Sequence, residues 1–371
     1  MNLHFTPEQD QLRAAVRRWV ERQYGFERRR KIVAAGGFER EAYAEMAALG
    51  LAGLCVPSAH DGLGMGPIES MIAMEELGAG LVLEPIIQSL VSATLLSQYA
   101  DPTLRKHWLP AIASGEALVV LAHQESGGRY QVDRCTTSAT RSESGWTISG
   151  TKILVAAGDC ADAMLVSAQS GSNVSLFLVN PRDPLCSVSG HLMQDGSRAA
   201  EVVFKQVPAA LVTADGGSAL ADAYAIGVAG VCAFGVGAME RMLASTVEYM
   251  KDRKQFGAAI ASFQALRHRV ADMKLQLELA RSMSYYASLK LSSPAAVRDV
   301  AIARAKVQLG ASMRFVGQQA VQLHGGIGMT DELPLSHYFK ALTQLEMSWG
   351  DTVHHLELVS NSMGLEAGVL E

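Results

Sequence analysis

The sequence predicts an α+β protein with an N-terminal helical domain, a central small antiparallel β domain and a C-terminal four-helix bundle. Three observations support this prediction. Helical patterns fill residues 1–114, short β-prone runs fill residues 115–215, and long helical patterns fill residues 216–371. A chain of 371 residues is long enough for more than one such domain.

The first helix has a well-defined start. Thr6 can cap it, Pro7 suits its first turn, and Gln9 completes a capping box. Apolar residues from Leu12 to Val20 then fall on one face. Further helical patterns cover residues 43–49, 68–77 and 101–109. We therefore expect the domain up to about residue 114 to be entirely helical.

Short β-prone runs begin after Gly115. They cover residues 119–121, 146–148, 163–166, 175–179 and 202–204. Gly, Ser, Asn and Asp residues separate these runs, which is typical of a small antiparallel sheet or barrel. The pattern ends near Pro208.

Four long helical patterns follow, over residues 220–253, 263–290, 295–324 and 334–362. The stretch from Gly325 to Gly328 separates the third pattern from the fourth. Four long helices with short connections predict a helical bundle.

The composition narrows the classes of function. A net charge of −5 without a basic stripe argues against nucleic acid as a partner. Five scattered cysteines without CxxC spacing predict neither a disulfide framework nor a metal site, and they fit a reducing cytoplasm. No signal-peptide pattern begins the chain, and no apolar run reaches the length of a membrane span. We expect a cytoplasmic protein, and its 49% apolar share fits an obligate oligomer or a well-packed soluble enzyme.

One candidate binding region lies where the first bundle helix ends and the second begins. Arg253, Gln255 and Phe256 close the first helix, and Gln264 opens the next. An arginine can bind a phosphate through two N–H groups, and a phenylalanine can stack on a purine. These residues indicate a dinucleotide-binding region without a Gly-rich phosphate loop. The alternative is a capped helix pair with a solvated Arg253.

The second candidate region is the stretch from Gln322 to Gly328. Gly325 and Gly326 would let the backbone approach a phosphate closely, and exposed N–H groups can bind anions. A glycine that ends a helix explains the same residues equally well. We expect His324 to be a local hydrogen-bonding residue rather than a base.

Together these two regions resemble the acyl-CoA dehydrogenase family. The resemblance extends over nearly the whole chain, because family-like pieces also occur at residues 50–57, 62–64, 75–78, 109–116 and 150–152. Each piece is modest, but their order and spacing are specific to the family.

The resemblance implies a tetramer built from dimers, with FAD held across a subunit interface. It implies that the adenosine diphosphate half of FAD, lying mostly in the neighbouring subunit, is contacted by Arg253, Gln255, Phe256, Gln264, Gln322, Gly325 and Gly326. The family oxidises an acyl-CoA substrate between the α and β carbons. A glutamate takes the α proton, the flavin N5 receives the β hydride, and electrons pass to an electron-transfer flavoprotein.

The catalytic glutamate is missing at the family's usual place, before a Gly-Thr pair. Either Trp349 or Gly350 falls there, and neither can take a proton. A few relatives carry the glutamate on the first bundle helix, where this chain has Gly227. The nearest carboxylates, Glu346 and Asp351, are better explained as surface or helix-end charges. The catalytic residue is therefore not assigned.

The segments that face the flavin in the family are altered as well. Leu154 and Ala156 replace its usual Trp and Thr, and Gln124-Glu125-Ser126 replaces its Thr-Glu-Pro. The chain thus resembles the small subunit of heteromeric acyl-CoA dehydrogenases, of the pimeloyl-CoA or steroid side-chain type, which implies a paralogous partner subunit. Two alternatives stay open: a self-sufficient homo-oligomer that uses a displaced carboxylate such as Asp351, and a non-catalytic acyl-CoA-binding assembly protein.

Overall fold

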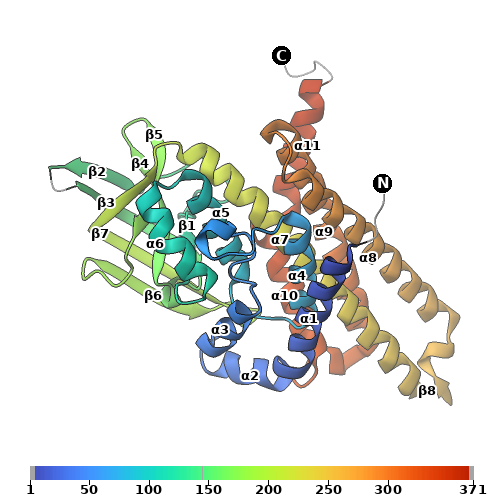
Figure 1. Cartoon of the computed structure of the whole chain (residues 1–371). Helices are drawn as coiled ribbons and strands as arrows, with labels where there is room; N and C mark the ends of the chain where they lie inside the picture. The colour runs from blue at the N-terminus through green and yellow to red at the C-terminus, as the bar shows by residue number, and fades with distance from the viewer. Residues whose placement is uncertain (1–4, 144, 367–371) are drawn as a thin grey trace. The chain divides into compact units, whose positions relative to one another are not determined.

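The computed structural model describes residues 5–143 and 145–366. The chain forms two compact units, each built from segments that are not contiguous in sequence. The helical unit comprises residues 1–29, 67–82 and 228–371, and the sheet unit comprises residues 30–66 and 83–227. Figure 1 labels the elements of both units. The division into domains 1–114, 115–215 and 216–371 stays a prediction.

The helical unit contains most of the long helices of the chain (Figure 1). Its elements are α1 (Pro7–Gln23), α4 (Pro67–Ala79), the larger part of α7 (Gly216–Asp252), β8 (Lys254–Gln255), β9 (Ala258–Ala259), η3 (Ile260–Ser262), α8 (Gln264–Lys290), α9 (Ala295–His324), η4 (Gly325–Met329), α10 (Pro334–Met347) and α11 (Thr352–Glu366). The predicted capping box of α1 is confirmed, because Thr6 N–H donates to Gln9 Oε1 at 3.0 Å and Gln9 N–H donates to Thr6 Oγ1 at 3.3 Å.

Helices α4 and α7 touch backbone to backbone through two glycines. A Cβ added at Gly78 would lie 2.0 Å from the carbonyl oxygen of Phe234, and one added at Gly237 would lie 1.8 Å from that of Glu75. Only glycine permits such an approach, so this sequence fixes the spacing of the two helices. Arg13 of α1 then binds Glu75 at 2.9 Å and attaches the first helix to this pair.

The fourth predicted bundle helix is in fact two helices, α10 and α11, and the prediction of one continuous helix over residues 334–362 was wrong. Trp349 and Gly350 lie between them with φ of +58° and +101°. A right-handed helix cannot pass through such values, since it requires φ near −60°. The chain therefore leaves α10 after Met347 and starts again at Thr352.

Helix α7 qualifies the expectation that no segment could span a membrane. By length and composition alone it is long and apolar enough to do so, and it is the one such helix among the residues that the structure describes. Two-thirds of its most apolar window is buried inside the protein, as in an ordinary core helix.

The sheet unit is built around one seven-stranded sheet. Its strands are β1 (Val119–Ala122), β2 (Ser138–Ser142), β3 (Gly145–Ala156), β4 (Ala163–Ser170), β5 (Asn173–Val179), β6 (Cys186–Leu192) and β7 (Arg198–Thr213). The order is β1-β4-β2-β3-β7-β5, with β6 also paired to β7. Because β4 pairs with β5, the sheet closes on itself. The pairings are antiparallel except β1–β4 and β2–β4, so the predicted antiparallel β region is confirmed in its main part.

Shorter elements accompany the sheet. They are α3 (Arg40–Ala48), η1 (Ser58–His60), α5 (Ile86–Tyr99), α6 (Pro102–Ala113) and η2 (Gly158–Cys160), while α2 (Phe26–Ala34) has residues in both units. Strand β7 continues past the predicted end near Pro208 because Ala209, Ala210, Leu211 and Thr213 pair with β5, with a register shift before Thr213. The three-part order of helices, sheet and helical bundle is as the sequence predicts.

Candidate functional site

The first candidate region forms a short hairpin between α7 and α8 (Figure 1). Strands β8 and β9 pair, and Phe256 and Gly257 make the turn with φ of +52° and +80°. Two consecutive positive φ values are the signature of a type I′ turn, which matches the twist of a hairpin. The turn leaves the Phe256 side chain 94% exposed, at the tip of the hairpin.

The remaining residues of this region are also exposed. Arg253 lies at the base of the hairpin, where its N–H donates to Tyr249 O and its carbonyl accepts from Ile260 N–H, both at 2.8 Å. Gln264 is the first residue of α8, and the preceding Phe263 provides no side-chain cap. A guanidinium, an aromatic ring and an uncapped helix N-terminus are thus close in sequence and accessible, which suits a diphosphate and a purine.

The second candidate region ends α9 at its C-cap, Gly325, whose N–H donates to the carbonyl oxygens of Val321 and Gln322. Gly325 and Gly326 are exposed, and a Cβ added at either would meet no atom within 4 Å. Gln322 is exposed on the last turn of the helix. In contrast, Gly328 is buried, and a Cβ there would lie 2.9 Å from the Cβ of His324. Gly325 and Gly326 therefore form an accessible backbone surface, whereas Gly328 has a packing role.

Tyr249 and His324 bring the two regions together. Their rings stack with centroids 4.2 Å apart, and the Tyr249 hydroxyl donates to His324 O at 3.2 Å. His324 Nδ1 lies 2.9 Å from the carbonyl oxygen of Ala320, so Nδ1 carries the proton, and burial lowers the pKa of the imidazole. His324 is a local hydrogen-bonding residue, as predicted, and the ends of α7 and α9 lie side by side in the helical unit.

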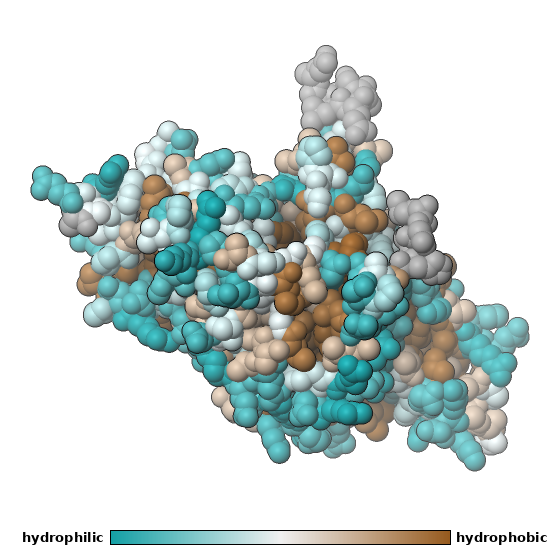
Figure 2. Space-filling view, viewed as in Figure 1, coloured by the Kyte–Doolittle hydropathy of each residue, from teal (hydrophilic) through white to brown (hydrophobic). Residues whose placement is uncertain are grey.

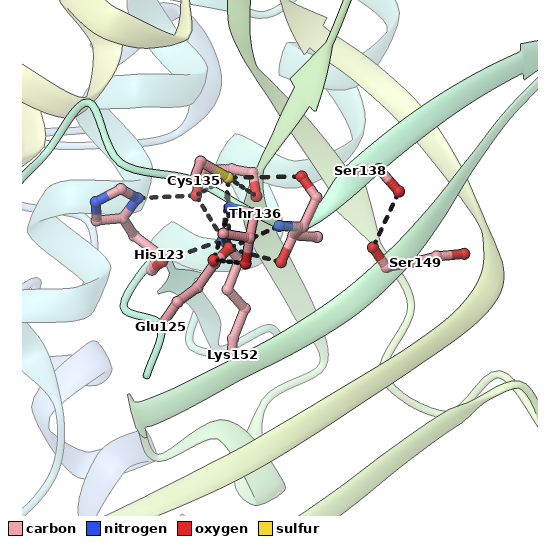
Figure 3. A network of polar contacts seen from close by, with 9 residues as sticks. His123, Glu125, Cys135, Thr136, Ser138, Ser149 and Lys152 are labelled. Carbon is pink, nitrogen blue, oxygen red and sulfur yellow. Dashed lines mark hydrogen bonds and ion pairs between the residues drawn. The ribbon is translucent and has the colours of Figure 1, made fainter. Parts of the chain in front are cut away.

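A buried ion pair organises the second set of predicted segments, in the sheet unit (Figure 3). Lys152 on β3 is completely buried, and its Nζ donates to Glu125 Oε1 at 2.6 Å and to His123 O at 3.1 Å. Burial would raise the pKa of Glu125, but hydrogen bonds from Lys152, Thr136 and Thr137 outweigh it and hold the pKa well below its ordinary value. The Glu125 carboxylate is therefore ionised at neutral pH and accepts hydrogen bonds at both of its oxygens.

This ion pair fixes residues 123–126 against β3. Ile153 N–H donates to Gln124 O at 2.8 Å next to it. Directly afterwards the strand bulges between Lys152 and Val155, and Leu154 takes a φ of +52° with its side chain 44% exposed. The scaffold of this segment is thus polar and rigid, whereas its outward residue is apolar.

The loop between α10 and α11 is held by another buried lysine. Lys306 on α9 is fully buried, and its Nζ donates to the carbonyl oxygens of Leu345, Glu346, Ser348 and Gly350 at 2.7–3.0 Å. Burial lowers the pKa of Lys306 to about 8, which still leaves the ammonium charged at neutral pH.

Both carboxylates near this loop have helix-end roles. Glu346 accepts from Thr352 N–H at 3.1 Å and from Arg314 at 3.0 Å. Asp351 Oδ1 accepts from His354 N–H at 2.8 Å, which makes it the N-cap of α11. The other position considered for the base, Gly227, is a buried residue of α7.

Two family models match the chain in agreement with this architecture. The acyl-CoA dehydrogenase N-terminal domain matches residues 6–116, and the C-terminal domain matches residues 216–364. The chain belongs to the acyl-CoA dehydrogenase family.

Individual members of the family are similar over most of their length. Acyl-CoA dehydrogenase FadE27 of Mycobacterium tuberculosis is 28% identical over 88% of each chain. Among solved structures, a variant of the Tcur3481–Tcur3483 steroid ACAD has a TM-score of 0.90 at 25% identity, covering 97% of this chain and 99% of that one. PigA with FAD and proline has a TM-score of 0.90 at 23% identity, covering 99% and 100%, which shows a common fold.

The residues present fit one half of the family's FAD cofactor better than the other. Of the residues that the resemblance assigns to the adenosine diphosphate half, Arg253 and Phe256 are exposed, and Gly325 has free space around it. On the flavin side, the exposed Leu154 and the small Ala156 provide no polar side chain. The exposed polar side chains thus lie at the positions that the resemblance assigns to the diphosphate half.

Sequence reasoning missed the residues that hold these segments in place. Lys306 and the Lys152–Glu125 pair were given no role, although one signal was available for Lys306. It stands in helical register with the buried Ile302 and Leu309, on a face that otherwise carries apolar residues. A charged residue in such a register indicates a buried ion or hydrogen-bond network.

Proposed function

We propose that this chain is the subunit without the catalytic glutamate in a hetero-oligomeric, FAD-dependent acyl-CoA dehydrogenase that desaturates an acyl-CoA thioester. The partner is a paralogous subunit that supplies the glutamate. One observation carries the proposal. The residues expected to bind the diphosphate are exposed, whereas the carboxylates nearest to the base position, Glu346 and Asp351, are hydrogen-bonded to the start of α11.

In this proposal the helical unit contributes to a FAD held mainly by the partner. Arg253 binds the diphosphate, Phe256 stacks on the adenine, and the amide groups of Gln255 and Gln264 bind polar atoms nearby. Gln322 and the Gly325–Gly326 backbone contact the same half of the cofactor. The bound FAD would supply the redox chemistry, and an electron-transfer flavoprotein would receive the electrons.

Exposed apolar side chains support assembly into an oligomer such as a tetramer. Leu275 and Leu279 on α8 and Val353 and Leu356 on α11 are all more than 40% exposed. Figure 2 shows apolar areas among the hydrophilic ones along the helical bundle. Apolar surface of this kind marks protein–protein contacts. The name of the steroid ACAD mentioned above lists two proteins, Tcur3481 and Tcur3483, which supports a two-subunit arrangement. We place the complex in the cytoplasm.

The alternative of a self-sufficient enzyme with Asp351 as its base receives less support. Asp351 caps α11, and a base that must move during turnover would lose this hydrogen bond. A non-catalytic protein without flavin would leave the exposed Arg253 and Phe256 without a function.

The deciding experiment is co-expression with a paralogue that has Glu before Gly-Thr. We expect a stable complex with about one productive flavin for each pair of subunits, and acyl-CoA-dependent dye reduction that the isolated chain lacks. The proposal fails if the isolated chain oxidises an acyl-CoA at an ordinary enzymatic rate and Asp351→Asn abolishes that activity.

A further inference from the structure

His355 lies on the first turn of α11 and is held in one orientation. It is 4% exposed, and its Nε2 lies 2.9 Å from the carbonyl oxygen of Trp349. A carbonyl only accepts, so Nε2 carries the proton and Nδ1 is an unprotonated acceptor. Nδ1 is buried and has no hydrogen-bond partner among the residues that the structure describes. Burial, together with the nearby Lys306 and His354, lowers the pKa of His355 to about 4, so the ring is neutral at pH 7.

The ring of His355 fills the space beside Gly350. A Cβ built on Gly350 would lie 2.6 Å from His355 Nε2 and 2.7 Å from His354 Cδ2. Real side chains do not approach so closely, so one of the groups would have to move. His354 is half-buried, whereas His355 is buried and would lose its bond to Trp349. Gly350 also has a φ of +101°, which disfavours any L side chain.

The backbone of the loop cannot move aside either. The carbonyl oxygens of Ser348 and Gly350 bind Lys306 Nζ at 2.8 and 2.7 Å, and that of Trp349 between them binds His355. Three consecutive carbonyls are thus attached to two buried side chains. Breaking these bonds would leave buried polar groups unsatisfied, which is costly.

We propose that His355 is a positioning residue that closes position 350 to every side chain, while Lys306 holds the loop against it. At position 350, the absence of a base is then built into the fold and is not a single missing residue. Its meaning for catalysis rests on the proposed function, because Gly350 is one of the two residues at the family's base position. The steric closure itself depends on neither flavin nor partner.

A double-mutant cycle on the full-length chain tests the proposal. Gly350→Ala, His355→Ala and the double variant are compared by chemical denaturation at one protein concentration. Gly145→Ala is the matched control, because Gly145 has a φ of +119° and an added Cβ there would meet nothing within 4 Å. We expect Gly350→Ala to raise the unfolding constant at least about tenfold more than Gly145→Ala, or about 1.4 kcal/mol. In the His355→Ala background this excess should disappear.

Two further measurements test the proposal: the yield of folded protein and the NMR signal of His355. If Gly350→Ala yields no folded protein, recovery of folded protein in the double variant supports the same conclusion. NMR of ¹⁵N-labelled histidine should show the tautomer of His355 with the proton on Nε2, and Gly350→Ala should alter that signal whereas Gly145→Ala should not. The proposal is overturned if the two alanine substitutions cost the same, or if His355→Ala leaves the cost of Gly350→Ala unchanged. Failure of the heteromeric function would change none of these readings.

Discussion

Replacing Lys306 by methionine should destabilise the helical unit severely, because the ammonium organises the whole α10–α11 loop. Four carbonyl oxygens lie within 3.0 Å of Nζ, but an ammonium has three N–H groups, so three full hydrogen bonds form at a time. Bonds from a charged donor contribute about 1.5–3 kcal/mol each, or about 5–9 kcal/mol together. Burying the ammonium offsets several kcal/mol. We therefore expect the free energy of unfolding to fall by about 3–5 kcal/mol.

The assay is chemical denaturation of the full-length chain, followed by circular dichroism at fixed protein concentration. Lys274→Met is the matched control, since Lys274 is exposed on α8 and pairs with Glu278 across one turn. An exposed pair of this kind is worth about 0.3–0.5 kcal/mol. Equal losses for Lys306→Met and Lys274→Met would refute the reasoning, because a buried anchor and a surface pair would then be indistinguishable.

Three further outcomes are expected. Arg253→Ala should weaken FAD retention in the complex about ten- to a hundredfold, because a charge-assisted phosphate contact contributes about 1.5–3 kcal/mol. Flavin absorbance after gel filtration measures the retention, and the control Lys251→Ala should leave it unchanged. Gly78→Ala should lower the thermal midpoint strongly or abolish folding, since its Cβ would lie 2.0 Å from a backbone oxygen of α7. A midpoint within about 1–2 °C of the parent, which is the effect of a surface change, would contradict the close helix contact. Burial lowers the pKa values of His123 and His355 to about 4, so the stability that each contributes is complete above pH 6.5 and is lost as the pH falls toward 4. His123→Gln should therefore flatten the fall in denaturation midpoint between pH 6.5 and 5. An unchanged profile would show that the buried imidazole does not titrate in this way.

The sequence predicts those features that depend on local pattern. The capping box at Thr6, the long helices and the exposed residues around Arg253 all follow from short-range signals. Helix α5 escaped prediction because it is buried on nearly every side and so has no amphipathic period. Strands β2 and β6 escaped it because they are mostly exposed and polar, unlike the apolar runs that indicate a strand.

The buried polar pairs could not be predicted from the sequence for a different reason. Lys152 and Glu125 are 27 residues apart, and Lys306 binds carbonyls about 40 residues away. The register of Lys306 indicates a buried position, but a single sequence does not show which distant residues it binds. The break between α10 and α11 could have been suspected from Gly350, but only the contacts of Lys306 and His355 explain why the loop takes this form.

Backbone strain links the three segments that the sequence singles out. Phe256 at the hairpin, Leu154 at the bulge and Trp349 in the α10–α11 loop all have positive φ, which bulky residues rarely adopt. Each such conformation costs about 1–3 kcal/mol and persists only where the surroundings determine it. Here the surroundings are specific: a type I′ hairpin, a register shift on β3, and carbonyl bonds to Lys306 and His355. Under the proposed function, the same strained segments would complete a site shared with a partner subunit that performs the proton transfer.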